Sequence, residues 1–176
     1  MTEFAIRNAS LFAGKNVLEL GSGTGFLGLA IARLLQPRAV YLTDGNHDVL
    51  NILRSNVEIN ALLNASVLKL DWFQCEEAAL PASVDVVIAS DVVFDPAFMA
   101  PLARTINWLI TKFPGVNVLL ALSVRNMETL AQFSDHVSER GLEMSVVEEV
   151  CVPTGRLQAC YTMIAPVRIL QLTRQL

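Results

Sequence analysis

The chain has 176 residues, of which 53% are hydrophobic and 17% are charged, and its formal net charge is −4. This composition excludes a disordered chain, and the acidic balance argues against nucleic acid bound on a general basic face. No uninterrupted apolar run is long enough to cross a membrane, and no charged start followed by an apolar segment indicates a signal peptide. We expect one folded domain over residues 1–176, with no membrane and no direct nucleic-acid partner.

The cysteines and histidines give no pattern of a disulfide framework or a metal site. Cys75, Cys151 and Cys160 are widely spaced and form no C-x-x-C pair, and His47 and His136 lack metal-ligand spacing. Reduced thiols in a cytosolic or nuclear protein are typical of such usage, so we expect a cytoplasmic protein without a bound metal.

Apolar periodicity and turn residues divide the chain into alternating helices and strands. In chain order we expect a helix over 2–13, a strand over 16–20, a helix over 26–35, a strand over 39–43, a helix over 48–60, strands over 66–70 and 84–89, a helix over 96–113, a strand over 116–123 and a helix from 126 to about 141. The runs 142–150 and 158–165 flank a Pro-Thr-Gly turn with no helix between them, which predicts a C-terminal β-hairpin.

Residues 16–30 form the central motif, an apolar strand, a glycine turn and an apolar helix. Gly21, Gly23 and Gly25 alternate in the turn, where glycine lets the backbone approach a ligand closely. The helix that follows offers free N–H groups to an electron-rich group. The motif therefore predicts a loop that binds a nucleotide or cofactor. The alternative is that the glycines only form a tight turn between strand and helix, with no ligand.

Two cofactor fingerprints overlap in this motif. Gly23, Gly25 and Gly28 satisfy G-x-G-x-x-G, the dinucleotide pattern, and Asp44 lies in the position of its acid. Glu19 and the three alternate glycines instead satisfy E-x-G-x-G-x-G, which resembles the first motif of class I S-adenosylmethionine-dependent methyltransferases. Five β-α alternations closed by a hairpin fit the methyltransferase sheet better than the classical dinucleotide fold. We therefore expect an α/β fold of the class I methyltransferase (Rossmann-like) type, with helices on both faces and a C-terminal antiparallel hairpin.

Ligands in such a sheet bind beyond the carboxyl ends of the strands, so the residues there are the candidate cofactor contacts. Asp44 follows the second strand and suits the ribose hydroxyls, or else caps a helix. Asp71 and Trp72 follow the third strand and suit adenine, although Trp72 also suits the core. Glu19 can meet the positive amino group of a methionine moiety or serve a structural role.

Asp91 and Phe94 follow the fourth strand, where a carboxylate beside an aromatic ring can hold an ammonium group. Methyl transfer to an amine depends mainly on alignment and desolvation, and Asp91 would orient the lysine and accept its proton, directly or through water. A helix-capping role is the alternative for Asp91, but Asp95 and Pro96 suit that role better. After the fifth strand, Asn126 suits the N-cap of the next helix. Arg125, beside it, suits a contact with a protein substrate.

These residues resemble one known family, the seven-β-strand family 16 protein-lysine methyltransferases. The resemblance is carried by the glycine motif of residues 17–25, by Leu70-Asp71-Trp72, and by Asp91 to Phe94, which fits the D/E-x-x-Y/F motif. Within that family, segments 37–39, 90–96 and 123–129 most resemble the elongation factor 2 lysine methyltransferase subgroup.

The resemblance implies S-adenosyl-L-methionine as cofactor and a lysine of elongation factor 2 as substrate. It implies Asp91 and Phe94 as catalytic residues, and as cofactor-binding residues Glu19, Gly21, Ser22, Gly23, Gly25, Asp44, Asp71, Trp72 and Ser90. The chain departs from the family in carrying Phe94 where Tyr is common. It is also expected to lack an upstream segment, with a Trp that helps close the cofactor pocket.

Three alternatives remain open from the sequence. The chain can be a family 16 methyltransferase with another protein substrate, such as a chaperone. It can be a catalytically inactive binding module that keeps the fold. An NAD-dependent oxidoreductase fits G-x-G-x-x-G but lacks an evident acid-base catalyst.

Overall fold

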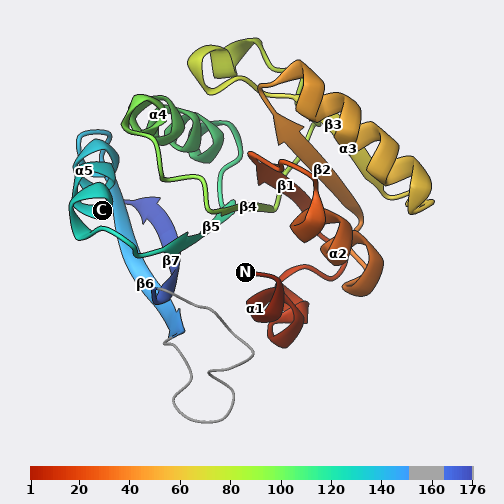
Figure 1. Cartoon of the computed structure of the whole chain (residues 1–176), viewed down its shortest axis with the longest axis horizontal. Helices are drawn as coiled ribbons and strands as arrows, with labels where there is room; N and C mark the ends of the chain where they lie inside the picture. Colours follow the sequence, from red (N-terminus) through yellow and green to blue (C-terminus); the bar gives the residue numbers. More distant parts are fainter. Residues whose placement is uncertain (151–164, 176) are drawn as a thin grey trace.

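In the computed structural model, which describes residues 1–150 and 165–175, seven strands form one mixed sheet (Figure 1). The spatial order is β3-β2-β1-β4-β5-β7-β6. The strands are β1 (Asn16–Leu20), β2 (Ala39–Asp44), β3 (Ala65–Lys69), β4 (Val86–Ser90), β5 (Asn117–Ser123), β6 (Leu142–Val150) and β7 (Val167–Arg174). Strands β1 to β5 pair in parallel, and β7 runs antiparallel to both β5 and β6. This arrangement confirms the predicted Rossmann-like sheet with antiparallel strands at its C-terminal edge.

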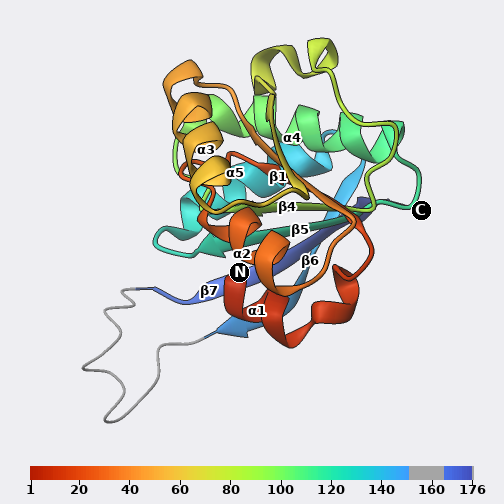
Figure 2. The same ribbon diagram turned by 90° about the vertical axis from the view of Figure 1, so that its right-hand side faces the viewer.

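Helices cover both faces of the sheet, so the central parallel strands are buried on both sides (Figures 1 and 2). The helices are α1 (Thr2–Arg7), α2 (Phe26–Leu34), α3 (His47–Ile59), α4 (Pro96–Lys112) and α5 (Met127–Ser138), with 3-10 turns η1 (Ala9–Leu11) and η2 (Trp72–Glu77). One apolar core joins the sheet to α4, α5 and η2, and the other joins it to α1, α2 and α3. No helix of the described residues is long and apolar enough to cross a membrane.

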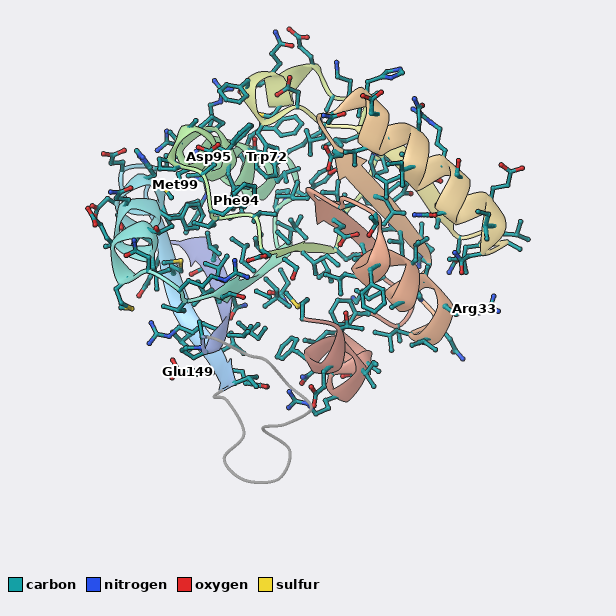
Figure 3. The ribbon with its side chains drawn as sticks, in the orientation of Figure 1. Arg33, Trp72, Phe94, Asp95, Met99 and Glu149 are labelled. Atoms are coloured by element: carbon teal, nitrogen blue, oxygen red, sulfur yellow. The ribbon has the colours of Figure 1, made fainter. Side chains whose placement is uncertain are left out.

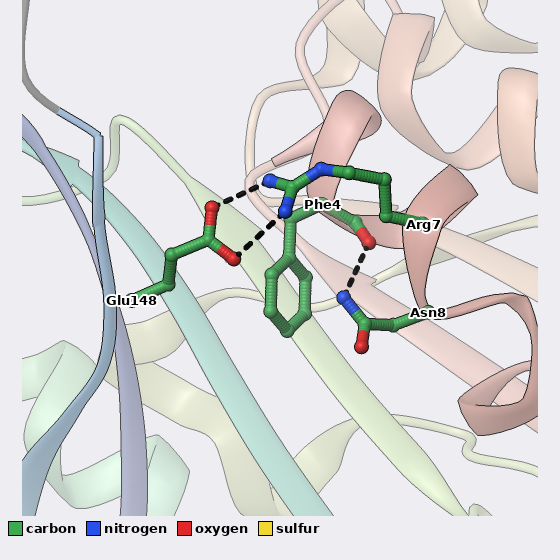
Figure 4. A network of polar contacts seen from close by, with 4 residues as sticks. All are labelled: Phe4, Arg7, Asn8 and Glu148. Carbon is green, nitrogen blue, oxygen red and sulfur yellow. Dashed lines mark hydrogen bonds and ion pairs between the residues drawn. The ribbon is translucent and has the colours of Figure 1, made fainter.

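The N-terminal helix is shorter than the predicted span 2–13. It ends at Arg7, because Asn8 takes a non-helical conformation and its side-chain amide donates to the Phe4 carbonyl at 2.9 Å. The guanidinium of Arg7 binds both carboxylate oxygens of Glu148 on β6, at 3.2 and 2.5 Å (Figure 4). The short helix is thereby joined to the edge strand of the sheet.

The C-terminal antiparallel pair also differs in position from the prediction. Strand β6 spans the expected residues Leu142–Val150, but its partner is β7 at Val167–Arg174. The predicted partner 158–165 lies, apart from Ala165, outside the described residues. Strand β7 buries Ile169, Leu170 and Leu172, and it also pairs with β5.

Candidate functional site

A cavity of about 500 Å³ lies at the carboxyl ends of the parallel strands. Each strand from β1 to β4 contributes the residues that follow it. The lining residues are Gly21 after β1, 44–46 at the end of β2 and just beyond it, 70–73 after β3, Asp91, Val92 and Phe94 after β4, and Phe98 from α4. This is the position where open α/β sheets bind ligands.

A second cavity of about 230 Å³ adjoins the first. It is lined by residues 122–126 at the end of β5, by Thr129 and Leu130 of α5, and by Val93. Asp91 and Phe94 line both cavities. A group that enters the small cavity therefore meets these two side chains at the border of the large one.

The glycine loop is held under the large cavity by polar contacts to β2. The Ser22 amide donates to the Thr43 carbonyl at 2.8 Å, and the Ser22 hydroxyl accepts from the Thr43 amide at 3.0 Å. Gly23 has a φ of +55°, and a Cβ there would meet nothing within 4 Å. Its backbone therefore faces open space, as the loop of a ligand site requires. Gly25, with a φ of +84°, is the N-cap residue of α2.

Glu19 lies below the loop and not in the cavity. The residue is 3% exposed, and its carboxylate accepts a hydrogen bond from the Gly28 amide in α2 at 3.1 Å. Burial raises the pKa of Glu19 to about 7, although hydrogen bonds from Ser22 and Gly28 oppose this shift. Of the predicted cofactor-binding residues, Glu19, Ser22, Gly23, Gly25 and Ser90 are not among those that line either cavity. This geometry favours the structural role for Glu19.

Asp44 lines the large cavity and does not cap a helix. Its Oδ2 accepts from the Gly23 amide at 3.3 Å, and its Oδ1 accepts from the Asn46 amide at 2.9 Å. The N-cap of α3 is Asn46, whose side chain accepts from the amides of Asp48 and Val49. The capping alternative for Asp44 is therefore excluded.

Asp71 and Trp72 form the opposite wall. The Asp71 carboxylate caps η2 by accepting from the Phe73 amide at 2.9 Å. The Trp72 ring packs edge-on against Phe98, with centroids 6.1 Å apart, and Phe98 contacts Phe73 at 5.5 Å. Figure 3 labels Trp72, at the start of η2, and Phe94, on the loop before α4. Our sequence reasoning missed Phe73 and Phe98, which line the same cavity as Trp72 and Phe94.

Asp91 has an unusual backbone for a residue other than glycine. Its φ is +56°, a left-handed conformation that costs free energy, and its amide donates to the Ala121 carbonyl at 2.9 Å. The carboxylate is 61% exposed and lies 4.0 Å from the guanidinium of Arg125. Asp95 caps α4 and Pro96 begins it, as predicted. Because strained residues are enriched at active sites, Asp91 is the strongest candidate for a reactive role.

The described residues include one of the three cysteines, and they can be searched for a metal site. Cys75 is a buried free thiol, whereas Cys151 and Cys160 lie outside the described residues. Within residues 1–150 and 165–175, no group of three or more His, Cys, Asp or Glu side chains is placed to hold a metal ion.

Comparison with known proteins gives the family. A profile described as lysine methyltransferase matches residues 3–140. The chain is 35% identical over 164 residues to the human protein-lysine N-methyltransferase EEF2KMT, covering 83% of this chain and 49% of that protein. It is 33% identical over 141 residues to a calmodulin-lysine N-methyltransferase of Arabidopsis thaliana, covering 78% of this chain and 46% of that protein. The chain thus spans about half the length of these curated relatives.

A solved structure of a SAM-dependent methyltransferase from Aquifex aeolicus has the same fold, with a TM-score of 0.69 at 15% identity, covering 97% of this chain and 88% of that one. S-adenosylmethionine is therefore the expected cofactor for a chain with this fold and these relatives. The chain belongs to the lysine methyltransferase family.

Proposed function

We propose that this chain is the catalytic part of an S-adenosylmethionine-dependent protein-lysine N-methyltransferase, and that its substrate is a lysine of elongation factor 2. The observation that carries the proposal is the pair of adjoining cavities that share Asp91 and Phe94. One cavity suits the cofactor, the other suits a lysine side chain, and a carboxylate and an aromatic ring lie between them.

The charge of the large cavity supports S-adenosylmethionine over NAD. Asp44, Asp71 and Asp91 line it, and no Lys or Arg is among its described lining residues. S-adenosylmethionine carries a positive sulfonium and a positive amino group, whereas NAD carries a negative pyrophosphate. Carboxylates attract the first ligand and repel the second.

Each candidate residue has a distinct part in binding. Asp44 accepts hydrogen bonds from the ribose hydroxyls, Asp71 accepts from the adenine amine, and Trp72 covers a ring face. Gly21, Gly23 and Gly25 let the backbone approach the ligand, and Glu19 and Ser22 hold that loop from below. Ser90 ends β4 next to Asp91 and makes no direct contact in this proposal.

Asp91 and Phe94 act on the lysine. The bound cofactor supplies a methyl group on a positively charged sulfur. Asp91 attracts the lysine ammonium and accepts its proton, directly or through water, so that a neutral nitrogen faces the cofactor cavity. The Phe94 ring, which is 71% exposed, adds a cation–π contact and excludes water. The family's common Tyr hydroxyl is not required for either role.

Elongation factor 2 is the favoured substrate because the human relative named EEF2KMT matches 83% of the chain, and because segments 37–39, 90–96 and 123–129 resemble that subgroup. Calmodulin is the competing substrate, since the relative named for it has a similar identity. A cytoplasmic location remains a prediction that accompanies this substrate.

Two measurements test the proposal. In calorimetric titrations of the chain, we expect binding of S-adenosylhomocysteine and none of NAD; the reverse result would overturn the cofactor. In a methylation assay with labelled S-adenosylmethionine, we expect labelling of elongation factor 2 and not of calmodulin. Labelling of calmodulin alone would mean that calmodulin, and not elongation factor 2, is the substrate. Cofactor binding without labelling of any protein in a lysate would indicate an inactive binding module.

A further inference from the structure

We propose that Arg104 is a positioning residue of the large cavity, which holds the backbone of Trp72 and Phe73 so that the aromatic wall keeps its shape. Arg104 lies on α4, outside the residues that line the cavity, and the sequence motifs do not include it. The inference rests on the proposed function, because the wall matters for catalysis only where the cavity binds the cofactor.

The contact joins α4 to η2. The Nη2 atom of Arg104 donates to the Trp72 carbonyl at 3.0 Å and to the Phe73 carbonyl at 2.5 Å. The next residue, Thr105, is fully buried, and its hydroxyl lies 3.4 Å from the Trp72 carbonyl and donates to the Pro101 carbonyl at 2.9 Å. The single Thr105 proton is used by Pro101, so Arg104 is the residue of α4 that donates to the Trp72 carbonyl.

The rings of the same segment are held by the same helix. Phe98, in the first turn of α4, packs edge-on against both Trp72 and Phe73. The Arg104 contact fixes the backbone of the segment and the Phe98 contact fixes its side chains. The wall of the cavity thus takes its position from two residues of α4, Phe98 and Arg104, which lie about 1.7 helical turns apart.

The glycine loop lies so close to Trp72 that it limits where the Trp72 side chain can lie. A Cβ on Gly21 would lie 3.2 Å from Cζ2 of Trp72 and 3.0 Å from Cγ1 of Val92. The indole edge therefore lies close to the loop at this end of the cavity, and a shift of the Trp72 backbone would move the aromatic wall relative to the loop. Since the cavity must keep its shape to bind the ligand, loss of the Arg104 contact should reduce the affinity for the ligand.

The test uses Trp72 as its own reporter in the full chain. Trp72 and Trp108 are its two tryptophans, so a Trp108→Phe background isolates Trp72. Arg104→Met keeps the apolar stem and removes the donors, while Arg104→Lys keeps a charged donor. Arg174→Met is the matched control, because Arg174 donates to the Thr111 hydroxyl at 2.5 Å near the other end of α4.

Without cofactor, we expect Arg104→Met to make Trp72 emission more sensitive to acrylamide quenching. With cofactor, we expect it to weaken calorimetric binding of S-adenosylhomocysteine about tenfold. Arg104→Lys should show quenching and affinity between those of Arg104→Met and those of the parent. Arg174→Met should match the parent in both measurements.

Unchanged quenching in Arg104→Met overturns the inference, and so does increased quenching with unchanged affinity. An equal loss of affinity in Arg174→Met also overturns it, because the effect is then one of general stability. If the parent chain binds no S-adenosylhomocysteine, the proposed function fails, and the quenching measurement still decides whether Arg104 anchors Trp72.

Discussion

The carboxylate of Glu19 and the amide of Gly28 meet at 3.1 Å between strand β1 and helix α2. A Cβ on Gly28 would lie 2.5 Å from the same Glu19 oxygen and 2.2 Å from Cδ2 of Leu42. The third glycine of G-x-G-x-x-G therefore serves the close packing of helix on sheet. That need is shared by dinucleotide-binding and methyltransferase sheets, which is why the two fingerprints overlap here.

We expect Gly28→Ala to destabilise the fold by about 1–3 kcal/mol, the usual cost of overpacking a filled core. The matched control is Gly45→Ala, where an added Cβ would meet its nearest atom at 3.5 Å, an ordinary contact. Denaturant unfolding measures both variants. Equal midpoints for Gly28→Ala and the parent would show that α2 can move away from β2 at no cost.

The buried Glu19 carboxylate predicts a pH-dependent stability. Its folded pKa is about 7, above the ordinary value of 4.5, so the folded chain binds the extra proton between these pH values. Stability should therefore fall as pH rises from about 4.5 to 7, by up to about 3 kcal/mol, and the Glu19 contribution should level off above pH 7.

Glu19→Gln should remove this slope, because the amide oxygen still accepts from Gly28 and carries no charge. Glu58→Gln, at an exposed position of α3, is the matched control and should keep it. The free energy of unfolding at a series of pH values measures the slope. A slope as steep in Glu19→Gln as in the parent would assign it to other groups.

Sequence patterns predicted the parallel half of the fold closely, because its strands are mostly apolar and its helices have clear caps. Asn46, Asp95 and Asn126 each accept from backbone amides at a helix start. The N-terminal helix was predicted too long, since the break at Asn8 depends on a bond from its own side chain to Phe4. The partner of β6 was misplaced, since a strand that also pairs with β5 is selected by contacts distant in sequence.

The candidate site was predictable where residues follow strands. Asp44, Asp71 and Asp91 come together at one sheet edge because parallel strands end there. Phe73, Phe98 and Arg104 were not predicted, because their places depend on how α4 packs against η2. The positive φ of Asp91 was also not predicted, since the residue type alone does not indicate a strained backbone.

Asp44 links the glycine loop to the ligand, so its loss should reduce cofactor affinity. We expect Asp44→Ala to weaken S-adenosylhomocysteine binding by about 1.5–3 kcal/mol, the range for hydrogen bonds to a charged group. Asp44→Asn keeps an acceptor and should lose less. Asp48→Ala, exposed in the first turn of α3, is the matched control in the same calorimetric titration. Parent-like affinity in Asp44→Ala would remove this residue from the cofactor site.

The last prediction separates function from stability at Asp91. Its left-handed backbone suits glycine better than aspartate, so Asp91→Gly should raise the free energy of unfolding, by up to about 1 kcal/mol after the entropic cost of glycine. Asp95→Ala, four residues later, should have the opposite sign and cost about 1 kcal/mol, because it removes the N-cap of α4. Thermal unfolding measures both.

Asp91→Asn completes the test, because asparagine tolerates the same backbone and lacks the charge. S-adenosylhomocysteine lacks the positive sulfonium that would face Asp91, so we expect Asp91→Asn and Asp91→Gly to bind it like the parent. We expect both variants to lose lysine methylation, whereas Asp95→Ala should retain it. Methylation by Asp91→Asn at the parent rate would remove the carboxylate from the mechanism. A gain in stability that coincides with a loss of turnover would instead mean that the strained backbone is kept for the side chain it carries.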